Sequence, residues 1–355
     1  MLQISDLTPL GWTDWFEERA IYGADETVAR VAAVDRDLLW LMDPTGTFRA
    51  KLAGRYLYRH QVSEERPCVG DWVCVERPAA EGVGLVRALL ERRTVLRRNS
   101  AGAAGEYQMI AANVDYVVVV QSCHYDFNLN RLERYLVMVR DGGAEPLVLL
   151  TKTDLVAPEV LARQLAEIEA AGVSASVLTV SNVTREGVDD LERRLQPGKT
   201  YCFVGSSGVG KSTLINGLIG RDALQTGGVS GTGEGRHTTV RRELIVLKSG
   251  ALVIDSPGMR EFGVIGAESG ISDSFANIVG LGSSCRYRDC SHSGEPGCAV
   301  LEAVESGAVT QEHYENYLKL RDESAFHEMS SIEKRKKDRD FGKFIKSVKK
   351  DLKKR

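Results

Sequence analysis

The sequence predicts a multidomain α/β protein of three parts: a small β-barrel of the oligonucleotide-binding type, a doubly wound parallel sheet and a helical C-terminal domain. Three observations indicate this division. Short strand-forming segments separated by turns fill the first part, strands and helices alternate in the middle, and clustered cysteines precede helical sequence at the end. We place the parts at residues 1–97, 98–268 and 269–355, and a chain of 355 residues suits two or three domains.

Five short segments between Glu26 and Val95 predict the barrel. They read TVARVAAVD, LLWLM, TFRAKLAG, DWVCVE and GLVRALL, with turn sequences such as DPTG and EGVG between them. Five strands suit a small barrel, of which the oligonucleotide-binding type is one; a generic small β domain is the alternative. One stretch also mixes cations with aromatic rings, which suits nucleic-acid binding but is common on ordinary strands. Its residues are Arg49, Lys51, Arg55, Tyr56, Tyr58 and Arg59.

The alternation of strands and helices from about Val114 to Asp255 predicts the parallel sheet. DYVVVVQS, PLVLLTKTD, ASVLTVS, KTYCFV, ELIVLK and ALVID have the pattern of buried strands. LNRLERYLVMVR, PEVLARQLAEIEAAG, VDDLERRL and KSTLINGLI have the pattern of helices. Such a sheet is covered by helices on both faces and binds ligands outside the carboxyl ends of its strands.

A glycine-rich loop between a predicted strand and a predicted helix matches the phosphate-loop pattern. Its glycines allow backbone N–H groups to turn inward around phosphates, at the positive end of the following helix. Lys211 is expected to reach the β- and γ-phosphates and to be catalytic, and Ser212 to bind Mg²⁺. The expected phosphate-binding residues are Gly205, Ser206, Ser207, Gly208, Val209, Gly210, Lys211, Ser212 and Thr213.

The segment VIDSPG supplies the second half of a nucleotide site. An apolar strand brings Asp255 to its carboxyl end, where an aspartate binds Mg²⁺ directly or through water. Gly258 then offers a backbone N–H to the γ-phosphate. Alone this segment fits any strand that ends in a turn, but its position after the phosphate loop favours the nucleotide site.

The tetrapeptide TKTD at 151–154 ends another strand of the sheet and predicts a guanine-binding loop. Asp154 can accept hydrogen bonds from the guanine N1–H and 2-amino groups, which adenine does not present, while the stem of Lys152 covers the base. Beside a phosphate loop this pattern selects GTP over ATP. The expected guanine-side residues are Thr151, Lys152, Thr153 and Asp154, with Ser181 and Asn182 in a second loop.

The guanine loop precedes the phosphate loop in this chain, the reverse of the order in an ordinary GTPase. Because a parallel sheet positions each loop by the spatial neighbours of its strand, the same site forms when the chain begins at a different strand. The order therefore predicts a circularly permuted nucleotide-binding domain.

Three cysteines and one histidine lie within fourteen residues near the C-terminus: Cys285, Cys290, His292 and Cys298. Three thiolates and an imidazole form a complete tetrahedral set for one structural Zn²⁺. A disulfide or a redox switch is the alternative. The other four cysteines are scattered among apolar neighbours, which is typical of reduced core thiols.

The charge is unevenly distributed, although the net charge is only −3. Residues 334–355 carry twelve Lys/Arg and three Asp, which leaves an acidic body with a basic tail. The tail favours a polyanionic partner, and a solvated tail that serves solubility is the alternative. No segment has the length and apolarity of a membrane span, and the N-terminus lacks a signal-peptide pattern, so we expect a cytosolic protein.

The motifs together resemble the RsgA (YjeQ) family of circularly permuted GTPases over nearly the whole chain. The resembling segments are LGWTDWF, VGDWV, IAANVDYVVVV, GSSGVGKSTLIN, GRHTTV, DSPGMREF and CRYRDCSHSGEPGCAV. The resemblance implies an oligonucleotide-binding barrel, a permuted GTPase and a zinc-binding helical domain. It also implies GTP hydrolysis coupled to late maturation of the small (30S) ribosomal subunit, bound at ribosomal RNA. This chain has Thr151 where the family usually has Asn, and SNV at 181–183 where it usually has a small Ser-Ala pair.

The water-orienting group of the reaction requires a separate prediction. Met259 follows Gly258 at the position where Ras-like enzymes place a glutamine, and a thioether cannot orient water. His237 in GEGRHTTV is the candidate that the resemblance favours, although a loop histidine is as often an ordinary polar residue. Thr238 or Thr239 is expected to bind Mg²⁺ together with Ser212 and Asp255.

Two other functions compete with a ribosome-assembly GTPase: an RNA-binding nucleotide switch with negligible turnover, and a phosphotransferase built on the phosphate loop. TKTD argues against the phosphotransferase. The expected partners are GTP or GDP and the small ribosomal subunit with its RNA. We expect the protein to be a monomer and to have no membrane partner.

Overall fold

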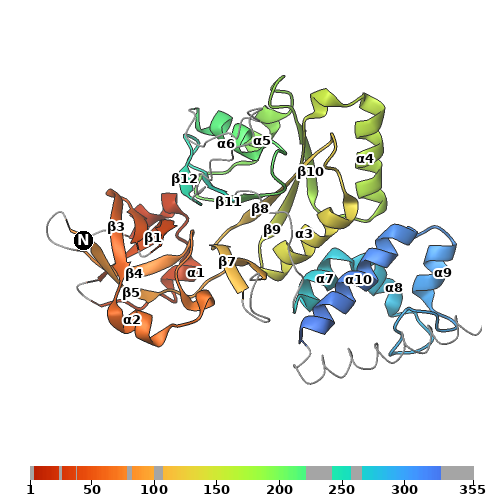
Figure 1. Ribbon diagram of the computed structural model, residues 1–355, viewed down its shortest axis with the longest axis horizontal. Coiled ribbons are helices and arrows are strands. Elements are labelled where there is room, and N and C mark those ends of the chain that lie inside the picture. The colour runs from red at the N-terminus through yellow and green to blue at the C-terminus, as the bar shows by residue number, and fades with distance from the viewer. Residues whose placement is uncertain are drawn as a thin grey trace, which may run out of the picture.

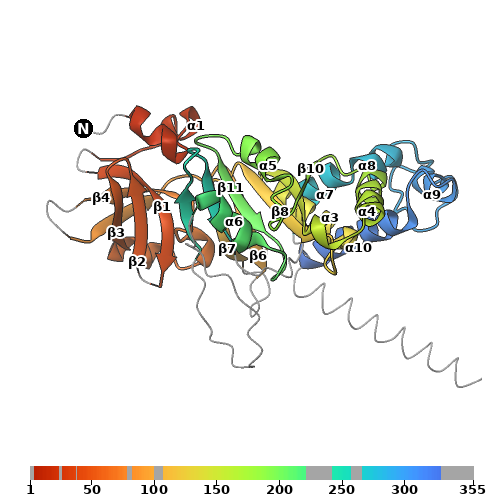
Figure 2. The same cartoon turned by 90° about the horizontal axis from the view of Figure 1, so that it is seen from above.

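The structure is a computed structural model that describes residues 4–23, 26–36, 38–77, 82–99, 107–220, 242–256 and 266–328. Figures 1 and 2 show three bodies in a row, with a barrel at one end, a sheet covered by helices in the middle and a group of helices at the other end. The predicted three-part α/β fold is thereby confirmed.

Five strands close the N-terminal barrel in the order β1-β2-β3-β5-β4. Their bounds are β1 Glu26–Asp35, β2 Leu38–Asp43, β3 Gly46–Leu52, β4 Trp72–Glu76 and β5 Gly84–Leu89. Only the β3–β5 pair is parallel among the barrel pairings, so the strands follow the Greek-key connectivity of the oligonucleotide-binding type. Alternate small and branched side chains such as Ala29, Val31 and Val73 fill the interior.

An aromatic cluster covers one end of the barrel. Two short helices, η1 (Ile4–Leu10) and α1 (Asp14–Glu17), precede the first strand. The ring centroid of Trp12 lies 4.8 Å from that of Trp72 on β4 and 5.4 Å from that of Phe16. All three rings are buried, so the N-terminal segment is an integral part of the barrel core.

The stretch that mixes cations with aromatics is only partly strand. Arg49 and Lys51 lie on β3, but α2 (Gly54–Arg59) contains the other members, and a second short helix, η2 (Ser63–Glu65), follows it. Tyr56 is buried and donates a hydrogen bond of 2.5 Å to the carbonyl oxygen of Glu65. Its predicted availability for base stacking is therefore wrong, because its ring faces the protein.

Six strands form the central sheet in the order β10-β9-β8-β11-β13-β12. Their bounds are β8 Tyr116–Ser122, β9 Glu145–Thr151, β10 Ser176–Val180, β11 Thr200–Val204, β12 Leu244–Val246 and β13 Leu252–Asp255. The first five strands in this order are parallel. The expected parallel direction is wrong for β12, which pairs antiparallel with β13 because a short turn joins the two.

Helices cover both faces of this sheet. The helices α3 (Leu129–Asp141) and α4 (Pro158–Ala170) pack against the face that carries Val117, Val148 and Cys202. The helices α5 (Val188–Arg194) and α6 (Lys211–Ile219) pack against the face that carries Val118, Leu149 and Phe203. Because successive residues of a strand face opposite sides, these unbroken apolar runs supply both cores.

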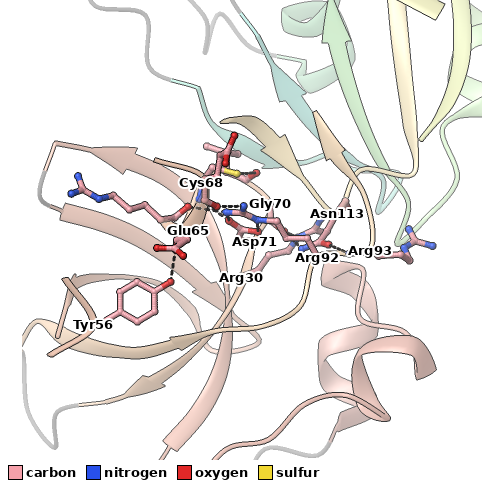
Figure 3. A network of polar contacts seen from close by, with 12 residues as sticks. Arg30, Tyr56, Glu65, Cys68, Gly70, Asp71, Arg92, Arg93 and Asn113 are labelled. Carbon is pink, nitrogen blue, oxygen red and sulfur yellow. Dashed lines mark hydrogen bonds and ion pairs between the residues drawn. The ribbon is translucent and has the colours of Figure 1, made fainter. Parts of the chain in front are cut away.

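A two-stranded sheet that the sequence did not predict lies between barrel and central sheet: β6 (Val95–Asn99) and β7 (Tyr107–Ala112). Next to it, the buried Arg30 donates to the carbonyl oxygens of Gly70 and Asn113, at 3.2 and 2.9 Å (Figure 3). It also donates to the carbonyl oxygen of Leu10 at 2.5 Å. Burial lowers the pKa of Arg30 to about 10, and the guanidinium joins the N-terminal segment, the barrel and the start of the central domain.

The C-terminal helices are α7 (Glu268–Ser274), α8 (Ala276–Gly282), α9 (Ala299–Glu305) and α10 (Gln311–Glu328). They pack around Phe275, Ile278 and Leu320. The helices α7 and α10 contact α3 of the central domain. The carboxylate of Glu133 on α3 is buried between His313 and Asn316 of α10, with the Asn316 Nδ2 donating at 2.5 Å. No described helix is long and apolar enough to cross a membrane.

Candidate nucleotide site and metal centre

The glycine-rich loop joins β11 to α6 at the carboxyl edge of the sheet. Gly205, Gly208 and Gly210 have φ angles of 145°, 80° and 98°, which L residues with side chains rarely adopt. At Gly205 a Cβ atom would lie 2.2 Å from the carbonyl oxygen of Val120 on β8. The loop therefore needs glycine both for its backbone angles and for its contact with the neighbouring strand.

Lys211 begins α6 and points back into the loop. Its Nζ donates to the carbonyl oxygens of Gly205 and Ser206, at 2.7 Å each, and the residue is only 5% exposed. Burial lowers the pKa of Lys211, and the nearby Asp255 raises it. A buried cation inside a glycine-rich loop, at the N-terminal end of a helix, fits the requirements of an anion-binding site.

Ser212 and Asp255 meet beside the loop. The hydroxyl of Ser212 donates to Asp255 Oδ2 at 3.1 Å, and burial raises the pKa of this carboxyl. Asp255 Oδ1 and the Ser256 hydroxyl are buried, with no hydrogen-bond partner among the described residues. A buried carboxylate oxygen without a partner next to a serine hydroxyl fits the oxygen ligands that Mg²⁺ takes beside phosphates.

The predicted guanine loops follow β9 and β10. Lys152 has a left-handed backbone with a φ angle of 58°, and the short helix η3 (Thr153–Leu155) comes directly after it. The Ser181 hydroxyl donates to Asp154 Oδ1 at 2.6 Å, and it accepts hydrogen bonds from the backbone N–H groups of Val183 and Thr184. Ser181 thereby fixes the Asp154 carboxylate and leaves its second oxygen available to a ligand.

Both predicted guanine loops contact the glycine-rich loop. Thr151 donates to the carbonyl oxygen of Val209 at 2.6 Å, and Asn182 donates through Nδ2 to that of Gly210 at 3.1 Å. The structure thus brings together the described residues of the predicted site from four strand ends that lie apart in the sequence. Gly258, His237, Thr238, Thr239 and Met259 lie outside the described residues.

Sequence reasoning missed the contribution of β8, the strand between β9 and β11. Gly205 packs against Val120, and the hydroxyl of Thr151 lies 3.2 Å from the carbonyl oxygen of Gln121. The missed signal was the polar sequence QSCHYD at the end of an apolar strand, a position where ligand-binding residues gather in parallel sheets.

The predicted metal ligands converge between α8 and α9. The ligand atoms of Cys285, Cys290, His292 and Cys298 all lie within 4.8 Å of one another. The Sγ atoms of Cys285 and Cys298 are 3.8 Å apart, and His292 Nδ1 lies 3.6 and 3.4 Å from them. Tetrahedral zinc, with bonds of about 2.3 Å to sulfur and 2.0 Å to nitrogen, requires separations of roughly 3.8 and 3.5 Å. The four residues can therefore hold a metal ion.

The backbone of His292 is held by a contact from outside the cluster. The Tyr314 hydroxyl on α10 donates to the main-chain carbonyl oxygen of His292 at 2.6 Å. Burial lowers the pKa of His292, as does the nearby Arg321, which favours the neutral imidazole that binds metals. Cys298 is buried in the helical core, so the cluster is part of the packing of the domain.

A phosphate-loop motif that follows its predicted guanine loops in the chain, on a sheet placed between a barrel and a helical domain with a Cys3His cluster, defines the class of circularly permuted GTPases. A family model described as RsgA GTPase matches residues 89–265. The chain belongs to the RsgA GTPase family, and it is a GTP-hydrolysing enzyme.

The relatives in this family cover nearly the whole chain. The chain is 44% identical over 322 residues to the small ribosomal subunit biogenesis GTPase RsgA 2 of Listeria monocytogenes, and the match covers 90% of each chain. It is 38% identical over 353 residues to the RsgA 2 of Vibrio parahaemolyticus, covering 98% of this chain and 94% of the other.

Two solved structures have the same fold. The crystal structure of YjeQ from Thermotoga maritima is 26% identical, with a TM-score of 0.62, and covers 83% of this chain and 97% of that chain. The structure of YloQ, described as a circularly permuted GTPase, is 24% identical with a TM-score of 0.62 and covers 88% and 100%.

The guanine loop can be tested by replacing Asp154 with Asn. We expect Asp154→Asn to weaken GTP binding by roughly 10- to 100-fold, the value of a lost charged hydrogen bond or two. The variant should gain affinity for xanthosine triphosphate, because the new amide can donate to the extra base carbonyl while Ser181 still donates to its oxygen. Titrations with GTP, ATP and xanthosine triphosphate measure the change.

The control for this experiment is Asp189→Asn, which makes the same substitution at an exposed position on α5. It should bind GTP as the wild type does. Equal affinity of the wild-type protein for GTP and ATP would contradict the assignment of Asp154.

Proposed function

We propose that this GTPase binds the small (30S) ribosomal subunit and couples GTP hydrolysis to its late maturation. The names of the Listeria and Vibrio relatives, small ribosomal subunit biogenesis GTPases, support this role. The observation that carries the proposal is that one chain joins a glycine-rich loop with a buried lysine, beside an Asp154 carboxylate oriented by Ser181, to a barrel of the oligonucleotide-binding type. Such a protein would act as a monomer in the cytoplasm, where it would meet the ribosomal subunit.

The proposed reaction depends on charge neutralisation at the phosphates. Lys211 and the N-terminal end of α6 would neutralise the β- and γ-phosphates. Ser212 and Asp255, with Thr238 or Thr239, would hold Mg²⁺, which would supply further positive charge to the site, and the N–H of Gly258 would contact the γ-phosphate. We assign the orientation of the attacking water to His237. The four-ligand cluster would hold one structural Zn²⁺.

The proposed RNA contact lies on the outside of the barrel. Arg49 and Lys51 are exposed on β3, and Arg55 and Arg59 are exposed on α2. Tyr58, which lies between these two arginines in the sequence, is 82% exposed. Arginines beside an exposed aromatic ring neutralise phosphates and stack on unpaired bases, which suits the single-stranded parts of a ribosomal RNA.

Co-sedimentation with small subunits tests the proposal. We expect the protein to pellet with 30S subunits in the presence of a non-hydrolysable GTP analogue and to be released with GDP. Arg55→Glu/Arg59→Glu should lower the bound fraction at least about ten-fold, most strongly at low salt, because the change replaces two phosphate contacts by repulsion.

The matched control is Arg163→Glu/Arg193→Glu, which makes the same charge change at side chains that are 67% and 76% exposed on α4 and α5. It should bind subunits with nearly wild-type affinity. Binding that is independent of the nucleotide would contradict the coupling. A GTPase rate that small subunits do not raise would favour the RNA-binding switch with negligible turnover.

A further inference from the structure

The first strand of the barrel, β1, contributes to two hydrophobic cores. Its pairing with β4 ends at Arg30, and a bulge at Ala32 interrupts its pairing with β2. Val31 packs inside the barrel. Ala32 packs instead in the central-domain cluster, which also contains Leu244 of β12 and Ile254 of β13. The bulge therefore turns β1 from the barrel towards the central sheet.

Beyond the bulge, β1 joins the edge of the central sheet, and Figures 1 and 2 show β12 beside the barrel. Ala33 forms an antiparallel β-bridge with Glu243, the residue directly before β12. The first residue of β12, Leu244, pairs with Ile254 of β13, and Asp255 follows Ile254. Because neighbouring strands lie about 4.8 Å apart, only about 10 Å separates the barrel strand from the strand that carries Asp255.

Arg30 fixes β1 at a second point, just before the bulge (Figure 3). Its Nε and Nη2 atoms donate to the carbonyl oxygens of Gly70 and Asn113, and Asn113 Nδ2 also donates to that of Gly70 at 3.3 Å. At Gly70, whose φ angle is 91°, a Cβ atom would lie 2.1 Å from the carbonyl oxygen of Ala112. Backbone packs directly against backbone here, so a rotation of the barrel would break these contacts.

Two such attachments make the barrel a rigid extension of the sheet at its β12 edge. The strand β12 has only three residues, held by β13 and by the bridge to β1. Asp255 Oδ1 is buried at the end of β13 with no hydrogen-bond partner among the described residues, so a ligand that binds it acts on this strand. Packed interfaces pass such a shift to their neighbours because they do not deform continuously.

We propose that β1 is the joint that couples the nucleotide site to the RNA-binding barrel. The state of the nucleotide beside Asp255 sets the position of β12, and the bridge between Ala33 and Glu243 passes this change to the barrel. Arg30 and Ala32 contact neither ligand, so they are positioning residues. The joint rests on the proposed function, because it names how its nucleotide and RNA sites influence each other.

The coupling is measured as a ratio of affinities. We expect wild-type protein to bind small subunits roughly five-fold or more tightly with a non-hydrolysable GTP analogue than with GDP. Small subunits should raise the preference for the analogue over GDP by the same factor, because coupling between two binding sites is reciprocal. Equilibrium titrations with both nucleotides and with purified 30S subunits give the two ratios.

Ala32→Leu places extra volume between β1 and the central core and should push the strand away from β12. We expect the ratio of subunit affinities to fall to about one, while the affinities of the free protein for the analogue and GDP stay within about two-fold of the wild type. The control is Ala171→Leu, the same substitution at a buried position of the same cluster, directly after α4. It should keep the wild-type ratio.

Arg30→Lys tests the second attachment. Lysine keeps the charge but has one nitrogen in place of the three that donate to the carbonyl oxygens of Leu10, Gly70 and Asn113. The ratio should again fall towards one, with nucleotide affinity retained. Melting curves of both variants, recorded by circular dichroism, report whether they fold.

Hydrogen exchange in the wild-type protein tests the joint without any substitution. Replacing GDP by the analogue should change the protection of the backbone amides in β12 and in residues 31–35 of β1 together. Strand β3, which does not pair with β1, should keep its protection. A change in β12 that does not reach β1, or no change in either strand, would overturn the joint.

The failure of the joint and the failure of the proposed function are distinguishable. Subunit binding by the wild type that is the same with both nucleotides would contradict the proposed function. A wild-type ratio that both Ala32→Leu and Arg30→Lys retain would overturn only the joint.

Discussion

Replacing Lys211 by Ala is expected to abolish GTP hydrolysis. Lys211 is the cation that begins α6 and lies buried among the loop carbonyls, where the low dielectric strengthens its attraction for phosphate. Removing one donor to a developing negative charge costs about 10²- to 10³-fold in rate, and a full charge lies at the upper end of that range. Steady-state release of phosphate from GTP measures the loss.

Lys199→Ala is the matched control, because Lys199 precedes the same strand β11 at the opposite edge of the sheet. Its Nζ lies 3.4 Å from Asp115, and its side chain is 39% exposed, so its removal should leave hydrolysis unchanged. Circular dichroism of both variants checks the fold. A Lys211→Ala protein that hydrolyses GTP at the wild-type rate would refute the phosphate site.

The parts of the fold that the sequence predicted have strong local patterns. The apolar runs of β8, β9 and β11 show the burial of parallel strands, and the glycine loop before KST marks the start of α6. Local pattern could not predict the direction of β12, because ELIVLK is apolar in either orientation. The pairing of β6 with β7 depends on residues that approach each other only in the folded chain.

The same distinction applies within the candidate site. The positions of Lys211, Asp154 and Asp255 were predictable because each lies in a motif at the end of a strand or the start of a helix. The contacts of Thr151 with Val209 and of Asn182 with Gly210 were not, because the partner in each case is a backbone carbonyl, which any residue carries. Contacts between side chains and backbone therefore need the three-dimensional structure.

Removal of one cluster ligand is expected to unfold the C-terminal helical domain while nucleotide binding remains. The loop between α8 and α9 contains little apolar sequence, and three of its apolar contacts with the helical core are made by the cysteines themselves. A bound metal would contribute directly to folding, because the free energy of binding is available only when all ligands converge. Cys290→Ser removes one of the four ligands.

We expect metal analysis to find about one Zn²⁺ per chain in the wild type and almost none in Cys290→Ser. The melting curve of the variant should show an additional transition below the melting temperature of the wild type. This transition would come from the C-terminal helical domain, in which α9 is no longer held against α10. GDP affinity should change little, because the phosphate loop lies on the far side of the sheet domain from these helices (Figure 1). Small-subunit binding should weaken if the helical domain takes part in it.

Ser293→Ala is the control for Cys290→Ser, since Ser293 is an exposed serine between two of the ligands. It should keep the metal and the melting curve of the wild type. A Cys290→Ser protein that still holds one metal ion per chain would remove Cys290 from the ligand set. A metal-free protein with an unchanged melting curve would refute the structural role, because a domain that depends on four converging ligands cannot keep its stability when the metal is absent.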